Sequence, residues 1–189
     1  MAGSLGSDER QRLFLALRLP AQTVAELAAW QAEELEGLGQ RARIAPREDL
    51  HVTLAFLGWR PVGELPAILD VLRRVAGDAG PVRLAVSGYR ETRSVGMLTL
   101  RDGTGAATAL ARRLHADLEA LGVYRRDVRP WLPHVTVLRF RERPRLRPEL
   151  PELGWVSSDA AAFLSRLHPQ IPAASAARYE VLESFRLGG

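Results

Sequence analysis

The tripeptide His-Val-Thr occurs twice in this chain, in similar surroundings. It stands at residues 51–53, inside the run 50–58, and again at residues 134–136, inside the run 133–140. Both runs are rich in β-branched and apolar residues, which favour β-strands. Residues two apart in a strand point to the same side, so each copy presents an imidazole beside a hydroxyl. The copies begin 83 positions apart, which predicts two similar halves, each built around one such strand.

The paired motifs also predict a chemistry. If the halves fold alike and face each other, the imidazoles of His51 and His134 and the hydroxyls of Thr53 and Thr136 converge on one cleft. Imidazole gives and takes protons near neutral pH, and a threonine hydroxyl can donate to a phosphoryl oxygen. A single His-x-Thr is more often a half-buried histidine beside a strand-forming residue. With four histidines and seven threonines, chance would give two such copies in about one chain in a hundred.

The charged residues favour anionic partners. All 26 basic residues are arginines and the net charge is +4, and arginine binds phosphates through two parallel hydrogen bonds. Arg139 and four further arginines lie in the stretch 139–147, after the second motif. A solvated basic loop and a surface for approaching nucleic acid are equally compatible with this pattern.

Several classes of protein are excluded or disfavoured by composition. The chain has no cysteine, which excludes disulfide frameworks and thiolate catalysis and suits the cytoplasm. No apolar run approaches the roughly 18 residues of a membrane span, so we expect no membrane partner. The sequence shows no cluster of metal-ligating residues at helical or hairpin spacing. We therefore expect neither a metal nor an organic cofactor.

The distribution of apolar residues predicts an α+β fold in a single domain, residues 1–189. The polar stretch 1–11 is expected to be a disordered tail, and the internal repeat divides the rest into about 12–95 and 96–189. Since strands alternate with helices but a helix does not follow every strand, an antiparallel arrangement is favoured over a parallel Rossmann sheet. Helices are expected at 23–38, 62–76 and 104–121, and strands at 13–19, 43–45, 50–57, 82–87, 97–100, across the second motif, 161–165 and 177–187.

Three other candidate features are weak. His115 lies on a predicted helix beside Arg112 and Arg113 and is expected at the surface, and His168 precedes a proline in a loop. Residues 103–105 read Gly-Thr-Gly, but the third glycine of a dinucleotide-binding fingerprint would fall at Thr108. The glycines therefore predict a helix start.

Beyond these features, the chain resembles the 2H phosphoesterase superfamily, which is defined by two His-x-Thr/Ser motifs. Within it, the chain is similar to the bacterial and archaeal RNA 2′,3′-cyclic phosphodiesterases, historically called 2′-5′ RNA ligases. The resemblance rests on residues 12–17, 49–58, 129–139 and 177–182. Asp49 stands where the family usually has asparagine, Trp131 where it has phenylalanine, and the strand 93–100 lacks a common tryptophan.

The resemblance implies two pseudo-symmetric lobes, each an antiparallel sheet with helices on its outer face, with the sheets lining a central catalytic cleft. It implies metal-independent hydrolysis of RNA ends or nucleotides carrying a 2′,3′-cyclic phosphate, which yields a 2′-phosphomonoester. By similarity, His51 is the proton donor and His134 the proton acceptor, while Thr53 and Thr136 bind the phosphate. Arg139 matches a family arginine that follows the second histidine by five residues and is expected to contact the substrate.

The residues themselves leave several points open. The two motifs are locally equivalent, so the sequence does not say which histidine is the acid. Strict alternation from His134 would place Arg139 on the opposite face, so its role requires a bulge or a strand end.

A reversible 2′-5′ RNA ligase and a catalytically idle nucleotide- or RNA-binding module are the alternatives to this function. Hydrolysis is favoured because water is present at about 55 M, whereas a second RNA end must first be bound. We expect a monomer.

Overall fold

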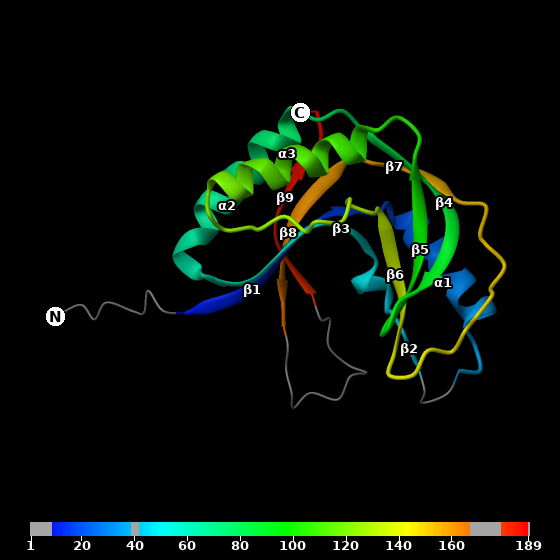
Figure 1. Ribbon diagram of the computed structural model, residues 1–189. Coiled ribbons are helices and arrows are strands. Elements are labelled where there is room, and N and C mark those ends of the chain that lie inside the picture. Colours follow the sequence, from blue (N-terminus) through cyan, green and yellow to red (C-terminus); the bar gives the residue numbers. More distant parts are fainter. Residues whose placement is uncertain (1–8, 39–41, 167–178, 189) are drawn as a thin grey trace.

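Both motif strands belong to one curved antiparallel sheet (Figure 1). The computed structural model describes residues 9–38, 42–166 and 179–188. The strands are β1 (Arg10–Arg18), β2 (Ala42–Ile44), β3 (His51–Pro61), β4 (Val82–Glu91), β5 (Val95–Asp102), β6 (His134–Phe140), β7 (Gly154–Ser157), β8 (Asp159–Ser165) and β9 (Tyr179–Arg186). The helices are α1 (Ala21–Glu34), α2 (Leu65–Gly77) and α3 (Ala106–Ala120), with 3₁₀ turns η2 (Arg47–Asp49) and η3 (Val62–Glu64).

The sheet consists of two lobes that meet between the two motifs. The strand order is β7-β4-β5-β6-β3-β1-β8-β9, with β2 also paired to β6. At the junction, β3 and β6 pair only through Val52 and Val135, the central residues of the two motifs. The predicted pair of antiparallel sheets is therefore confirmed, and one pairing joins them into a continuous surface.

The lobes are not successive halves of the chain, as the spacing of the motifs had suggested. Strand β4 comes from the first half but pairs with β5 beside the second motif, and β8 comes from the second half but pairs with β1. Each half thus contributes two strands to the other half's lobe, β2 and β4 from the first half and β8 and β9 from the second. Such pairings between distant segments leave no local signal in the sequence.

Helices cover the lobes on the side away from the cleft. Helices α2 and α3 pack against each other, α2 against β8 and β9 and α3 against β3 (Figure 1). The buried residues of α2 recur at intervals of three and four, as an amphipathic helix requires; they are Ile68, Val71, Leu72, Val75 and Ala76. On β1, Leu13, Leu15 and Leu17 are fully buried beneath this layer. The hydrophobic core therefore lies behind the sheet and leaves its other face free for the site.

Most elements lie where the sequence predicts them, with shifted ends. Strand β1 begins at Arg10, so Arg10 and Gln11 are not part of a tail. Helix α1 ends at Glu34 rather than at residue 38, and the segment predicted as one strand around 161–165 is preceded by a second short strand, β7. Residues 1–8, His168 and the start of the predicted strand 177–187 lie outside the described residues. Along the part of the chain that is described, no helix is long and apolar enough to span a membrane.

Candidate active site

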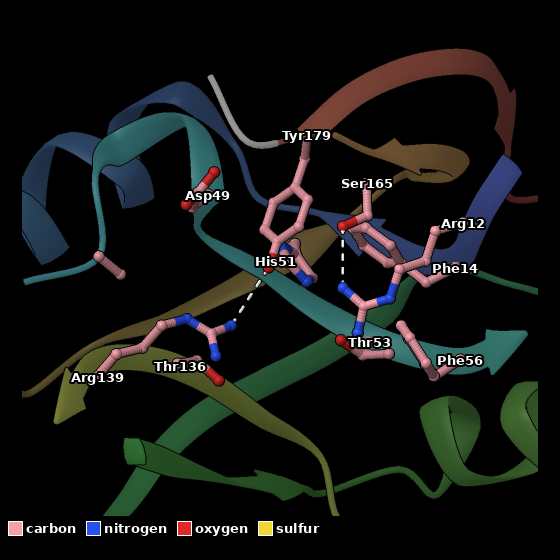
Figure 2. Close-up of a pocket in the computed structure, with 11 residues that line it drawn as sticks. Arg12, Phe14, Asp49, His51, Thr53, Phe56, Thr136, Arg139, Ser165 and Tyr179 are labelled. Carbon is pink, nitrogen blue, oxygen red and sulfur yellow. Dashed lines mark hydrogen bonds between the residues drawn. The ribbon is translucent and has the colours of Figure 1, made fainter. Parts of the chain in front are cut away.

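Residues of both motifs face one pocket of about 170 Å³ on the cleft side of the sheet (Figure 2). His51 and Thr53 reach it from β3, and Thr136 and Arg139 reach it from β6. His134 does not line this pocket; it precedes Thr136 by two residues on the same strand and lies at the junction with β3. The remaining lining residues are Arg12, Phe14, Ala45, Asp49, Phe56, Ser165 and Tyr179.

A bulge in β6 places Arg139 on the cleft face. Opposite β5, Thr136 pairs with Met97 and Leu138 pairs with Gly96, so Val137 has no counterpart. An extra residue of this kind reverses the alternation of side chains beyond it. Arg139 consequently points to the same side as Thr136, which is the geometry its predicted position required.

Strand β3 carries the equivalent bulge. Thr53 pairs with Ala16 and Ala55 pairs with Leu15, so Leu54 is skipped in the pairing with β1. Leu54 follows His51 by three residues, just as Val137 follows His134. Phe56, five residues after its motif histidine, is therefore the counterpart of Arg139 and lines the same pocket.

Each bulge is held by a buried polar side chain from a helix. The Nε2 atom of His115, on α3, donates to the carbonyl oxygen of Leu54 over 2.7 Å, because a carbonyl can only accept. On α1, the amide nitrogen of Gln31 donates to the carbonyl oxygen of Val137 over 2.9 Å. The carbonyl oxygen of Val137 also accepts from the backbone N–H of Ala45 over 2.9 Å, so two hydrogen bonds hold the bulge after the second motif.

The prediction that His115 lies at the surface is wrong: the residue is only 6% exposed. Its two arginine neighbours are exposed and suggested a polar face. The missed signal is its spacing of four from Ala111 and eight from Ala107, both of which are fully buried on the same stripe of α3.

The ring of His51 lies among three aromatic side chains. Its centroid is 4.8 Å from that of Phe14, 5.7 Å from that of Phe163 and 5.3 Å from that of Tyr179, which meets it edge-on. Burial lowers the pKa of His51 from its ordinary 6.5 to about 4. Without substrate, His51 is therefore neutral at neutral pH.

Polar neighbours modify this effect. Interaction with the backbone of Asp49 favours the protonated ring of His51 and raises its pKa, partly offsetting burial. The positive charges of His134 and Arg139 lower the pKa further. His134 is therefore close enough to influence the protonation of His51.

The ring of His134 is oriented by its own loop. Its Nδ1 lies 2.8 Å from the carbonyl oxygen of Leu132. Because that oxygen can only accept, Nδ1 carries the proton of this hydrogen bond. In the neutral ring, Nε2 then has the free lone pair and can accept a proton from a substrate.

Two guanidinium groups reach the pocket from opposite lobes. Arg139 donates to the hydroxyl of Tyr179 over 3.2 Å, and Arg12 donates to the hydroxyl of Ser165 over 3.3 Å (Figure 2). None of Arg12, Tyr179 and Ser165 was predicted as a site residue. They lie on β1, β9 and β8, whose approach to β3 depends on long-range pairing.

A tryptophan bridges the two motif strands. The indole nitrogen of Trp131, just before β6, donates to the carbonyl oxygen of Thr53 over 3.0 Å. The indole N–H is a donor that no purely hydrocarbon aromatic ring could supply. This hydrogen bond ties the segment before β6 to the first motif strand.

Together, the lining of this small pocket offers one imidazole, four hydroxyls and two guanidiniums, and the second imidazole, that of His134, lies at the junction of the motif strands. This set can bind a phosphate and move protons at its oxygens. Within the described ranges, no three His, Asp or Glu side chains gather as metal ligands would.

Comparisons with known proteins agree with this description. A family model described as the 2′-5′ RNA ligase superfamily matches residues 19–170. The RNA 2′,3′-cyclic phosphodiesterase of Thermus thermophilus is 32% identical in an alignment that is 192 residues long with its gaps. The alignment covers 94% of this chain and 91% of the relative. The protein of the same name from Escherichia coli is 29% identical over 132 residues, covering 70% of this chain and 73% of that protein.

Solved structures show the same fold. A crystal structure of a Thermus thermophilus protein matches with a TM-score of 0.78 and 32% identity, covering 94% of this chain and 98% of that one. The crystal structure of Escherichia coli LigT complexed with 3′-AMP matches with a TM-score of 0.80, covering 96% of this chain and all (100%) of that one. At 24% identity, the second match speaks to the fold alone.

Proposed function

The chain belongs to the 2′-5′ RNA ligase superfamily, and we propose that it is an RNA 2′,3′-cyclic phosphodiesterase that leaves a 2′-phosphomonoester. The observation that supports this most is the convergence of Thr53, Thr136 and Arg139 on one pocket, with His51 beside them and His134 at the junction of the motif strands. The relatives from Thermus thermophilus and Escherichia coli carry the same activity in their names.

The reaction requires one base and one acid on opposite sides of the phosphorus. The oxygen of a water molecule attacks phosphorus as the bond from phosphorus to O3′ breaks. We assign His134 as the group that takes the proton from water, since its bonded Nδ1 leaves Nε2 free to accept. His51 then supplies the proton that O3′ needs on leaving.

The lowered pKa of His51 has a consequence for this assignment. A ring with a pKa of about 4 is uncharged at neutral pH, so the imidazolium that acts as the acid must form after the substrate binds. The negative charge of the cyclic phosphate favours the charged imidazole and raises its pKa. Protonation of His51 is therefore coupled to the arrival of the substrate.

The remaining polar groups bind the phosphate. Thr53 and Thr136 donate to its non-bridging oxygens from the two lobes, and hydrogen bonds to a charged group contribute about 1.5–3 kcal/mol each. Arg139 adds a full positive charge and is held in place by Tyr179. These groups need no metal or organic cofactor to neutralise the phosphate.

The test is to incubate the purified protein with adenosine 2′,3′-cyclic phosphate and EDTA and to identify the product by ³¹P NMR. We expect 2′-AMP, with label incorporated into the phosphate when the water is enriched in ¹⁸O. Formation of 3′-AMP would show that O2′, and not O3′, is the leaving group. Activity that depends on a divalent cation would exclude the metal-free mechanism. If neither nucleotides nor RNA ends are hydrolysed, the proposed activity is wrong.

A further inference from the structure

Two large aromatic side chains are half-exposed on β3 next to the candidate active site. Phe56 is 49% and Trp59 is 53% exposed. Most large aromatic side chains in a folded protein bury their apolar surface, so two exposed ones close together on a functional face call for an explanation. Their orientation supplies the first part of it.

The bulges of β3 turn both aromatic residues toward the cleft. Phe56 pairs with the pocket residue Phe14, and Trp59 pairs with the pocket residue Arg12. The pairing also skips Leu57, so the alternation reverses a second time between the two aromatics. Because directly paired residues share a face of the sheet, Phe56 and Trp59 lie on the same side as the site.

Positive charge accompanies these rings. The guanidinium carbon of Arg12 lies 4.7 Å from the centre of the Phe56 ring (Figure 2), and Arg10 donates to the carbonyl oxygen of Trp59. Neither arginine forms an ion pair with an acidic residue in the described part of the chain. A ligand of this strip should therefore combine flat apolar faces with negative charge.

A single strand of RNA has both properties. Every base offers a π-face that stacks on an aromatic side chain, and every linkage carries a phosphate. One skipped residue leaves about two strand steps, or roughly 7 Å, between Phe56 and Trp59 along β3. That distance suits two successive bases of an unstacked strand.

Building on the proposed function, we infer that Phe56 and Trp59 form a stacking platform for the last two bases of a single-stranded RNA. Phe56 lines the phosphate pocket and takes the base of the nucleotide that carries the cyclic phosphate. Trp59 lies farther along β3 and takes the preceding base. Arg10 and Arg12 face the phosphate that joins the two nucleotides. The site is thus built for an RNA end, of which a mononucleotide fills only part.

The kinetic test compares three substrates. The first is a nucleoside 2′,3′-cyclic phosphate, and the second is a dinucleotide that ends in the same cyclic phosphate. The third is the same dinucleotide with an abasic sugar in place of its upstream nucleoside. Trp59→Leu should lower kcat/KM for the intact dinucleotide about five- to hundredfold, mainly through KM. The loss should be absent for the other two substrates. Phe56→Leu should lower kcat/KM for all three.

The control variant is Leu121→Ala, which changes a side chain of 38% exposure after α3, on the layer away from the cleft. It should leave all three substrates unaffected. An equal loss for the mononucleotide and the dinucleotide in Trp59→Leu, or no loss for either, would overturn the platform. So would a change in the sedimentation of the free Trp59→Leu protein, because the strip would then be an interface between copies of the chain.

A binding measurement separates this inference from the proposed activity. The stable dinucleotide with a terminal 2′-phosphate should quench tryptophan fluorescence, and Trp59→Phe should remove that part of the signal. Trp59→Leu should weaken binding by the same factor as it changes KM. Quenching without hydrolysis of any cyclic phosphate would support the platform and contradict the proposed activity. Hydrolysis without quenching would support the proposed activity and contradict the platform.

Discussion

The Nε2 atom of His115 lies 2.7 Å from the carbonyl oxygen of Leu54, and the bond holds the bulge that follows the first motif. Gln31 makes the corresponding bond to Val137 after the second motif. Each half of the chain therefore contributes a helix residue that fixes the bulge in the other half's motif strand. These two bonds lie at the bulges, and the bulges determine which later residues face the cleft.

Replacing His115 with Leu should therefore affect both stability and activity. A buried carbonyl left without its partner costs about 1–3 kcal/mol, which urea denaturation would measure. We expect the effect on activity to act through Thr53. The loss in kcat caused by Thr53→Val should therefore be smaller in the His115→Leu background than in the natural protein. The loss in kcat caused by Thr136→Val should be the same in both backgrounds. The exposed neighbour Arg112 supplies the control variant Arg112→Leu, which should alter stability by less than about 0.5 kcal/mol. Equal coupling to both threonines would show that His115 acts only on overall stability.

The sequence predicts the motif strands well because their signals are local. Alternation of apolar and polar residues places His51 with Thr53 and His134 with Thr136, and the structure has both pairs on strands. The bulges could not be predicted, since alternation alone carries no mark of a skipped residue. Arg139 could be assigned to the cleft only conditionally for this reason, and Phe56 was missed.

Long-range pairing accounts for the rest of what the sequence left out. Phe14 and Phe163, which surround His51 and contribute to its burial, come from β1 and β8, and Tyr179 comes from β9. Their apolar character predicts burial but not which histidine they surround. The motif pattern is therefore sufficient to find the reacting groups and insufficient to predict their pKa values.

The two histidines should be indispensable in the proposed mechanism. General acids and general bases each contribute about 10²–10⁴-fold to a rate, so His51→Ala and His134→Ala should each reduce turnover of a cyclic nucleotide by that order. Circular dichroism and thermal unfolding would verify that each variant folds. A folded variant with the rate of the natural protein would refute the two-histidine mechanism.

Burial of His51 should make stability depend on pH. Its pKa is about 4 when folded and 6.5 ordinarily, so the unfolded chain binds this proton more readily than the folded one. The stabilisation is complete above pH 6.5 and is lost as the pH falls toward 4, by at most about 3 kcal/mol. The free energy of unfolding, measured in urea at several pH values in this window, should fall more steeply for the natural protein than for His51→Gln. Parallel curves would mean that the folded ring titrates normally.

Tyr179 should influence binding through Arg139. The variant Tyr179→Phe keeps the ring against His51 but removes the hydroxyl that accepts from Arg139. Loss of a bond of about 1 kcal/mol predicts an increase in KM of about fivefold. In the Arg139→Gln background, the same substitution should have no further effect on KM. Additive effects would show that the hydroxyl contacts the substrate independently of Arg139.

The rate of the chemical step should follow a bell-shaped curve with pH. Catalysis requires one imidazole neutral to accept a proton and the other charged to donate one, so the enzyme is inactive when both are protonated or both are neutral. The bound phosphate favours the charged ring, and the two limbs report the pair rather than individual residues. Single-turnover rates from about pH 4 to 10 would reveal the curve even if product release is slow.

The threonines provide the matched comparison for this profile. Thr53→Val and Thr136→Val remove hydrogen bonds to the phosphate but leave both proton carriers in place. Each variant should therefore lower the height of the bell, by about tenfold for a bond of about 1.5 kcal/mol, without moving its limbs. A limb that shifts in either variant would show that the hydroxyl acts on a histidine rather than on the phosphate. A rate in the natural protein that climbs with pH and never declines would show that no protonated imidazole is needed, and His51 could not be the acid.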